Sequence, residues 1–205
     1  MIRRNCFSLG FVMILLQFTG INSNLYSQKF FGGVGDGYSA ASVITPVKGG
    51  EITGQVSYDN VPQSPINSVT VYLKLNNVVV AQTTTNNNGD FDLSVPENGT
   101  YSLSASCTLP WGGVNSADAL RTAQHFTGVI TLQGLKLRAA DVNNSNYINA
   151  TDALLIQRRF VGISNSFIAG DWFFETIPLI IGGGQAVTTN LKGICFGDVN
   201  GSYIP

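Results

Sequence analysis

The most informative stretch in the second half of the chain is DVNNSNYINATD, residues 141–152. Calcium-binding loops of the EF-hand type take their ligands from loop positions 1, 3, 5, 7, 9 and 12, and position 7 contributes its backbone carbonyl. The residues at these positions are Asp141, Asn143, Ser145, Tyr147, Asn149 and Asp152. An apolar helical pattern, ALLIQRRF, follows directly. The register predicts a calcium loop that leads into a helix, with an ion-free, Asn-rich surface turn as the alternative.

Two other positions of this stretch fit such a loop. Position 6 turns sharply with a positive φ and is usually glycine, which has no Cβ to clash. Here it is Asn146, and asparagine tolerates that conformation better than most residues. Ile148 at position 8 is expected to point inward.

The helix that follows has an earlier copy. VNSADALRTAQHFTG (114–128) aligns without gaps with INATDALLIQRRFVG (148–162), which predicts a pair of related helices. In the earlier copy, loop positions 7, 9 and 12 hold Gly113, Asn115 and Asp118. Positions 1, 3 and 5 fall on Cys107, Leu109 and Trp111, none of which offers a hard oxygen ligand. The first half of this loop is therefore missing.

The sequence CFGDVNGSYIP, residues 195–205, has the complementary defect. Asp198, Asn200 and Ser202 match loop positions 1, 3 and 5, and the second half is missing. We expect the two halves to come together as one split calcium loop. A degenerate first loop with an unrelated C-terminal tail is the alternative.

The N-terminal half has a different pattern. Short runs such as VTVYLKL (69–75) alternate apolar and polar residues and are separated by turn sequences such as NNNG and PENG. This pattern is typical of antiparallel strands with one buried face and predicts a small β-sandwich over residues 51–107, which SAASVITPV upstream could extend. The later runs DWFFE, IPLII and QAVTTNLKGICF are also β-like, and they could join the sandwich or pack on the helices. The expected fold class is α+β: a small antiparallel β-sandwich followed by a pair of calcium-loop helices with extra short strands.

These motifs resemble two known families. The helical pair and its loops, residues 108–205, resemble a type I dockerin written as a circular permutation. The motifs I-x-G-x-V, V-x-V-x-L, T-x-x-x-G-x-F and N-G-T-Y-x-L of residues 51–106 resemble a carboxypeptidase-regulatory-like (transthyretin-type) sandwich. The dockerin resemblance implies calcium as the cofactor and a cohesin-like or other surface protein as the partner. It also implies that partner recognition involves loop positions 10 and 11 and a basic pair on the second helix. The residues there are Ala150, Thr151, Arg158 and Arg159.

The N-terminus indicates export. Arg3 and Arg4 precede a short apolar stretch, which predicts a signal peptide over residues 1–27 and a Gly-rich leader over 28–50. No later apolar run has membrane length, so we expect a secreted or cell-surface protein without a transmembrane segment. Because signal cleavage removes two arginines and no acidic residue, the remaining chain is acidic and lacks a basic patch, which argues against nucleic acid as a partner.

Catalytic classes find little support. His125, the only histidine, lies in the helical repeat, which favours a packed or surface role on a helix over a histidine-based triad or zinc cluster. No pair of acidic residues outside the loops has a recognisable glycosidase context. We therefore expect a non-catalytic docking or adhesion protein, associated with cell-surface or polysaccharide-degrading assemblies. A carbohydrate-binding module that acts through the sandwich is the alternative, with Trp111, Trp172, Phe173 and Phe174 as a possible sugar platform.

Two cysteines remain after the signal peptide. If the split loop forms, Cys107 and Cys195 enter it from neighbouring backbone, which predicts a disulfide between them in an oxidising compartment. Two separate buried thiols are the alternative.

Overall fold

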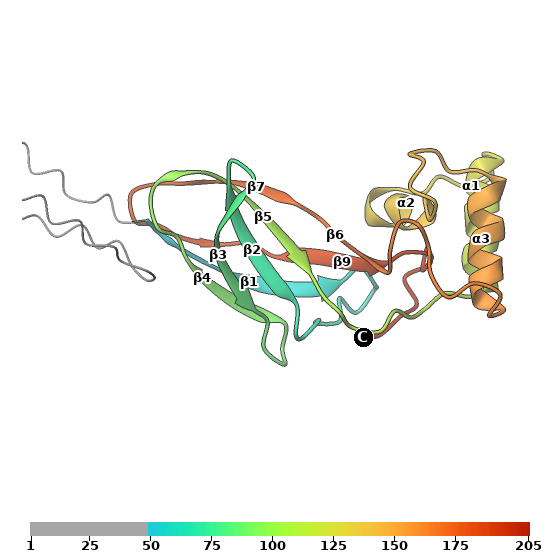
Figure 1. Ribbon diagram of the computed structural model, residues 1–205, viewed down its shortest axis with the longest axis horizontal. Helices are drawn as coiled ribbons and strands as arrows, with labels where there is room; N and C mark the ends of the chain where they lie inside the picture. Colours follow the sequence, from blue (N-terminus) through green and yellow to red (C-terminus); the bar gives the residue numbers. More distant parts are fainter. Residues whose placement is uncertain (1–48) are drawn as a thin grey trace, which may run out of the picture. The chain divides into compact units, whose positions relative to one another are not determined.

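The computed structural model describes residues 49–205 (Figure 1). The predicted signal peptide, nearly all of the leader and the upstream SAASVITPV extension lie outside the described residues. Across residues 49–205, every helix is too short or too polar to pass through a bilayer.

The elements follow one another as five strands, three helices and four further strands within the described residues. Their bounds are β1 (Glu51–Tyr58), β2 (Thr70–Leu75), β3 (Val78–Thr84), β4 (Asp90–Ser94), β5 (Gly99–Ser106), α1 (Ser116–Phe126), α2 (Gly134–Ala140), α3 (Ala150–Phe160), β6 (Trp172–Phe174), β7 (Ile177–Ile181), β8 (Ala186–Thr188) and β9 (Leu191–Cys195). The predicted fold class, an α+β protein with a β-sandwich-like body, is confirmed.

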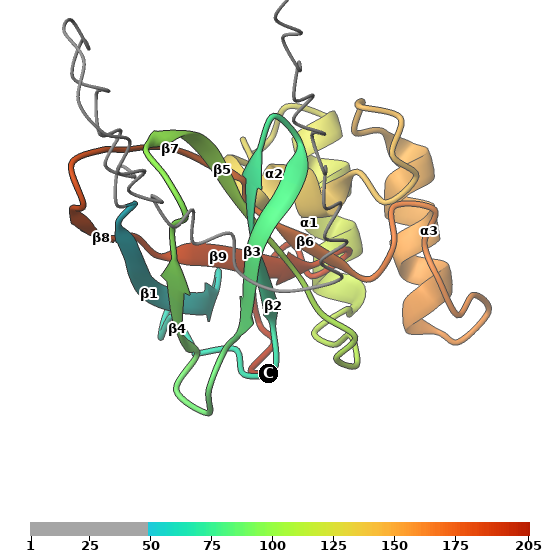
Figure 2. The same cartoon turned by 60° about the vertical axis from the view of Figure 1, so that its left-hand side comes forward.

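The strands form two sheets, with the orders β4-β1-β9-β6 and β3-β2-β5-β7, and β8 pairs with β1 beside β9 (Figure 2). The late strands, whose placement the sequence leaves open, thus belong to the sandwich: β7 pairs with β5, and β9 lies between β1 and β6. The pairings of β1 with β8 and β9 are parallel, and the other pairings are antiparallel. The body therefore takes strands from both sides of the boundary predicted at residue 107.

The core of the sandwich follows the alternation in the sequence. In VTVYLKL, the side chains of Val69, Val71 and Leu73 are fully buried, whereas Leu75 at the strand end is only partly buried. Ile52, Val56 and Tyr58 of β1 are also fully buried and face the same core. Tyr58 is the last residue of its strand, so its hydroxyl lies where β1 ends.

The helices have a small core of their own. It contains Ala119, Leu132, Ala140, Val142, Ile156, Phe167, Phe196 and Val199, with Ile148 packed against it. Phe196 directly follows β9, and Val199 lies three residues further on, so the segment that leaves the sandwich continues into the helical core.

Helices α1 and α3 begin and end alike because their sequences repeat. Each starts with a capping box, Asn115 with Asp118 in α1 and Asn149 with Asp152 in α3. Each is followed, two residues past its end, by a glycine with positive φ, 75° at Gly128 and 77° at Gly162, the conformation that commonly terminates helices. The Asn, Asp and Gly shared by the two copies in the sequence are therefore the residues that set the helix ends.

Candidate metal centres

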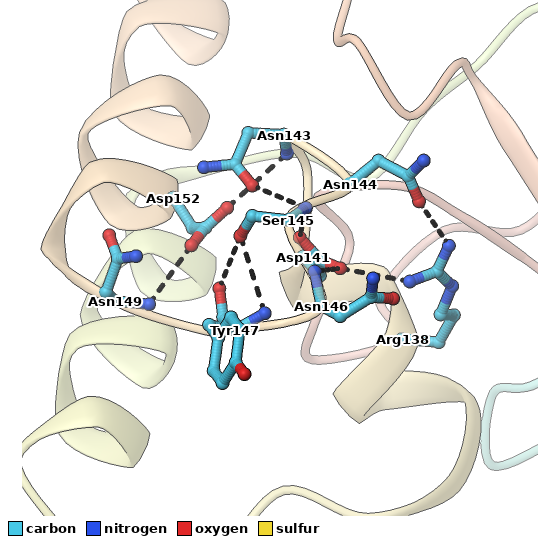
Figure 3. A network of polar contacts seen from close by, with 9 residues as sticks. All are labelled: Arg138, Asp141, Asn143, Asn144, Ser145, Asn146, Tyr147, Asn149 and Asp152. Atoms are coloured by element: carbon cyan, nitrogen blue, oxygen red, sulfur yellow. Dashed lines mark hydrogen bonds and ion pairs between the residues drawn. The ribbon is translucent and has the colours of Figure 1, made fainter.

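The intact loop, residues 141–152, folds around the carboxylate of Asp141 (Figure 3). Asp141 is buried at the end of α2. Its Oδ1 accepts a hydrogen bond from the backbone N–H of Ser145 (2.9 Å), and its Oδ2 accepts one from that of Asn146 (2.9 Å). The Ser145 N–H is also 3.0 Å from Oδ1 of Asn143, and the Ser145 hydroxyl donates to the Tyr147 carbonyl (3.0 Å).

Asp152 closes the other end of this loop. It is fully buried, and its Oδ2 accepts from the backbone N–H of Asn149 (3.0 Å) while its Oδ1 accepts from that of Asn143 (3.4 Å). Asn146 has φ 65°, as predicted for position 6. The six predicted residues of the intact loop thus lie close together in one loop between α2 and the first turn of α3.

The split loop has the same construction around Asp198, which is fully buried. Its Oδ1 accepts from the backbone N–H of Ser202 (3.0 Å), and its Oδ2 accepts from that of Tyr203 (3.0 Å). The Ser202 hydroxyl donates to the Gly113 carbonyl (3.2 Å), 89 residues away in the sequence. The structure therefore brings the two half-loops together.

Asp118 closes the split loop as Asp152 closes the intact one. Its Oδ1 accepts from the backbone N–H of Asn200 (2.8 Å), and its Oδ2 accepts from that of Asn115 (2.8 Å). Each hydrogen bond described for the split loop has a counterpart in the intact loop. The equivalent residues differ by 57 in sequence number in the first half of the loop and by 34 in the second half. Tyr203 takes position 6 of the split loop, because its N–H donates to the first aspartate as the N–H of Asn146 does in the intact loop.

Glycine is required at one point of the splice. Gly113 has φ 81°, and a Cβ there would lie 2.5 Å from the Asp198 carboxylate. A larger residue would push the two half-loops apart.

The first aspartate of each loop is held by a different outer group, and no motif in the sequence indicates either group. In the intact loop, Nη1 of Arg138 donates to Oδ2 of Asp141 (3.0 Å). In the split loop, the hydroxyl of Tyr58 donates to Oδ2 of Asp198 (2.6 Å) and accepts from the N–H of Cys195 (3.0 Å). Burial raises the pKa of Tyr58 well above its ordinary value, so this hydroxyl stays protonated and remains a donor.

The pKa of each closing aspartate is raised, because the carboxyl group is buried and a second carboxylate lies nearby. Burial raises the pKa of Asp118 to about 6; the nearby Asp198 carboxylate adds to the rise, and the N–H groups of Asn200 and Asn115 oppose it. Burial likewise raises the pKa of Asp152, with Asp141 adding to the effect. A cation between the two carboxylates of each loop would favour their charged forms.

The donor set fits calcium. Each loop offers two carboxylates with amide, hydroxyl and carbonyl oxygens, the hard neutral and anionic oxygens that Ca²⁺ prefers. Within residues 49–205, no three His, Cys, Asp or Glu side chains cluster as a metal site, so the remaining ligands must be neutral oxygens. Oδ1 of Asn200 is buried without a hydrogen-bond partner, as expected for an oxygen that is arranged to meet an ion.

The predicted disulfide is wrong: Cys107 and Cys195 are free thiols in the structure. Cys107 directly follows β5 of one sheet, and Cys195 is the last residue of β9 in the other. Packed sheets stand about 10 Å apart, whereas a disulfide needs Cα atoms about 5.5–6 Å apart. Burial raises the pKa of Cys195 to about 12 and also raises that of Cys107, so both remain thiols. The hydrogen bonds of the split loop hold the C-terminal segment instead.

The four residues predicted to contact a partner divide into two groups. Ala150, Thr151 and Arg158 are exposed. Arg159 is only 2% exposed, which corrects its expected role: Nη2 donates to Oδ1 of Asp171 (2.6 Å), and the guanidinium lies 3.8 Å from the Trp111 ring centroid. The cation joins α3 to the segment before β6 rather than facing a partner.

The aromatic run also packs inward. The Trp172 ring lies edge-on to Tyr58 (5.7 Å between centroids) and parallel to Phe174 (5.8 Å), and its Nε1 donates to the Leu109 carbonyl (3.0 Å). Phe173 packs against Phe196. These rings build the sandwich and its junction with the helices. Trp172, Phe173 and Phe174 also line a cavity of about 670 Å³ together with residues 105–109, so the sugar platform stays a prediction. His125 accepts the N–H of Leu132 at Nδ1 (3.2 Å), which is a structural role.

Part of this chain is similar to a known protein family. A search of curated proteins finds no match. Ten chains of solved structures match, among them the crystal structure of a DUF3823 family protein from Parabacteroides merdae ATCC 43184 at 1.80 Å resolution. That match has 12% sequence identity and a TM-score of 0.32, and it covers 73% of this chain and 47% of the solved one, about half of its length. Residues 112–161, which hold the intact loop, the second half of the split loop and all three helices, match the dockerin type I domain, a family whose members bind calcium and act as non-catalytic docking modules.

Proposed function

We propose that this is a secreted, non-catalytic protein whose calcium-loaded helical pair docks onto a cohesin-like domain of a surface protein. The observation that carries the proposal is the reproduction, in the split loop, of the hydrogen bonds that shape the intact loop. Two segments far apart in sequence would have no reason to match in this way unless both loops served the same ligand.

Each loop would hold one calcium ion. The intact loop offers Asp141, Asn143, Ser145, Asn149, Asp152 and the Tyr147 carbonyl; the split loop offers Asp198, Asn200, Ser202, Asn115, Asp118 and the Gly113 carbonyl. When bound, the ion supplies the positive charge that balances the two negative carboxylates of its loop. The chain itself contributes the backbone hydrogen bonds that hold the first and last aspartates of each loop close together.

The dockerin-like part would then be a circular permutation. The family match ends at residue 161, and the first half of the split loop comes from 198–203. In this arrangement the sandwich, a carboxypeptidase-regulatory-like module by its sequence motifs, is joined to the docking part at both ends of the latter. Export would follow from the predicted signal peptide over residues 1–27.

The helices present an apolar surface at related positions. Leu120 and Phe126 of α1 are 58% and 54% exposed, and their repeat counterparts Leu154 and Phe160 of α3 are 57% and 47% exposed. Exposed apolar side chains gathered on neighbouring helices are typical of a protein-binding surface. Arg158, Ala150 and Thr151 lie exposed on the same helix, α3, and would contribute to partner choice.

Calorimetric titration of the full chain with calcium tests the metal part of this proposal. The wild type should bind two ions, and Asp141→Asn and Asp198→Asn should each bind one. Affinities around 10⁻⁴ M or somewhat tighter are expected for loops of low ligand charge in extracellular modules. No binding at millimolar calcium would refute the proposal.

A pull-down with a purified cohesin domain, in calcium or in chelator, tests the docking part. Capture should require calcium and should weaken in Leu154→Ala, whereas Val61→Ala, which changes an exposed residue outside the helices, should behave as the wild type. A glycan array run in parallel distinguishes carbohydrate binding: glycan capture that survives chelator would favour the sandwich as the functional part.

A further inference from the structure

We propose that the two calcium sites are unequal: the split loop holds its ion more tightly, and that ion clamps the β-sandwich, whereas the ion of the intact loop joins two neighbouring helices. This inference rests on the calcium binding proposed above.

The first reason is where the ligands come from. The first half of the split loop follows β9, and its second half follows β5, so the ligands leave strands of opposite sheets. The intact loop lies between α2 and α3, and all of its ligands come from twelve consecutive residues. An ion in the split loop therefore joins the ends of both sheets to α1, while an ion in the intact loop joins two neighbouring helices.

The second reason is what surrounds each loop. The split loop is bonded to the sandwich through the Tyr58 hydroxyl on Asp198 and through Nδ2 of Asn60, which donates to the Tyr203 carbonyl (2.8 Å). The Tyr203 ring also packs edge-on against Tyr58 (5.6 Å). Anything that orders the split loop must therefore also order the end of β1. The outer group of the intact loop, Arg138, belongs to α2, and it meets the sandwich through a ring contact, with its guanidinium 5.6 Å from the Phe173 ring centroid of β6.

The third reason is charge. Arg138 places a cation 3.0 Å from Oδ2 of Asp141 and also donates to Oδ1 of Asn144 (2.5 Å), so part of the charge that calcium would supply is already present. A cation beside a metal site repels the incoming ion. The corresponding group in the split loop is the neutral hydroxyl of Tyr58, and Oδ1 of Asn200 has no partner, whereas Oδ1 of Asn143 already accepts from Ser145. The split loop therefore gains more from the ion.

Calcium titration combined with hydrogen-exchange mass spectrometry on the full chain tests the inference. The variants are a matched pair, Asp198→Asn for the split loop and Asp141→Asn for the intact loop, which keep size and remove one charge each. We expect two binding steps in the wild type, separated by roughly tenfold in Kd. Asp141→Asn should keep the tighter step, and Asp198→Asn should keep the weaker one.

The exchange readout separates the clamp from simple binding. In Asp141→Asn, calcium should increase the protection of β1 and β9; in Asp198→Asn, it should protect the region around the intact loop and leave β1 and β9 unchanged. A gain-of-charge pair provides a second route if Asp198→Asn fails to fold: Asn200→Asp should tighten the tighter step, and Asn143→Asp the weaker step.

The outcomes are distinguishable from those of the proposed function. If no variant and no wild type binds calcium, the proposed function fails. If two ions bind but Asp198→Asn retains the tighter step, or if calcium leaves the exchange of β1 and β9 unchanged in Asp141→Asn, only the clamp is refuted.

Discussion

The hydroxyl of Tyr58 gives the sharpest test of how the sandwich holds the split loop. Tyr58 is fully buried, and Phe at this position keeps the ring that packs against Trp172 and Tyr203. The change removes the 2.6 Å hydrogen bond to Asp198 and leaves the buried N–H of Cys195 without its acceptor. A hydrogen bond to a charged group contributes about 1.5–3 kcal/mol, and an unsatisfied buried N–H costs about 1–3 kcal/mol. The free energy of unfolding should therefore fall by about 3–5 kcal/mol.

Urea denaturation in chelator measures this loss directly. Tyr72→Phe is the matched control, because its hydroxyl bonds Ser106 at the exposed surface (3.1 Å) and its removal should cost less than about 0.5 kcal/mol. In thermal denaturation, a body of this size should lose on the order of 10 °C in Tm with Tyr58→Phe. A Tyr58→Phe protein as stable as Tyr72→Phe would show that the hydroxyl does not anchor Asp198.

Four other predictions concern charged side chains. Arg138→Gln should raise the calcium affinity of the intact loop by about three- to thirtyfold, since it removes a cation beside Asp141; calorimetry in the Asp198→Asn background isolates that site. The pKa of Asp118 is about 6 in the folded protein, against an ordinary 3.8. The folded protein therefore loses this proton at a higher pH than the unfolded chain, and the free energy of unfolding in chelator should fall by up to about 3 kcal/mol as the pH rises from about 4 to about 6. Asp118→Asn should abolish that dependence on pH. Calcium affinity of the split loop should weaken below about pH 6 for the same reason, and unchanged affinity at about pH 5 would contradict it. Arg159→Met should lower the free energy of unfolding by about 1–3 kcal/mol by removing a buried ion-pair partner, while the exposed Arg158→Met should change it by less than about 0.5 kcal/mol; equal effects in urea denaturation would show that the buried cation is not structural.

The local features of the fold could be predicted from the sequence because short stretches determine them. The positive φ of Asn146, the capping of α3 by Asn149 and the burial of alternate residues in β2 each depend on a few neighbouring side chains. The split loop was also predictable, although it is not local, because each half keeps the ligand spacing of an intact loop. The ligand spacing can be recognised in each half separately, and the positions that one half lacks indicate which residues must complete the loop.

Other features left no such trace. Nothing in the residues of β9 shows that it lies between β1 and β6, because backbone pairing over long separations does not depend on a motif. Arg159 looks like the surface arginine next to it, and only its surroundings in the fold, the Asp171 carboxylate and the rings of Trp111 and Phe167, make burial favourable. Tyr58 and Arg138 were missed because their role depends on where β1 and α2 end relative to the two aspartates. For Tyr58, the alternation of β1 indicates an inward side chain but not its partner.

The place of β9 also determines the order in which the molecule can assemble. Strand β1 has β9 as its neighbour over Val56–Tyr58, so an emerging chain that has reached only residue 190 carries β1 with that edge open. The helical segment 112–161 has all its residues by then, but the first sheet does not. Pairings over such separations are slow to form, and an open strand edge invites association with other chains. Productive folding should therefore begin late, after synthesis or export has delivered residues 191–203, and a chaperone that shields β1 until then should raise the yield of folded protein.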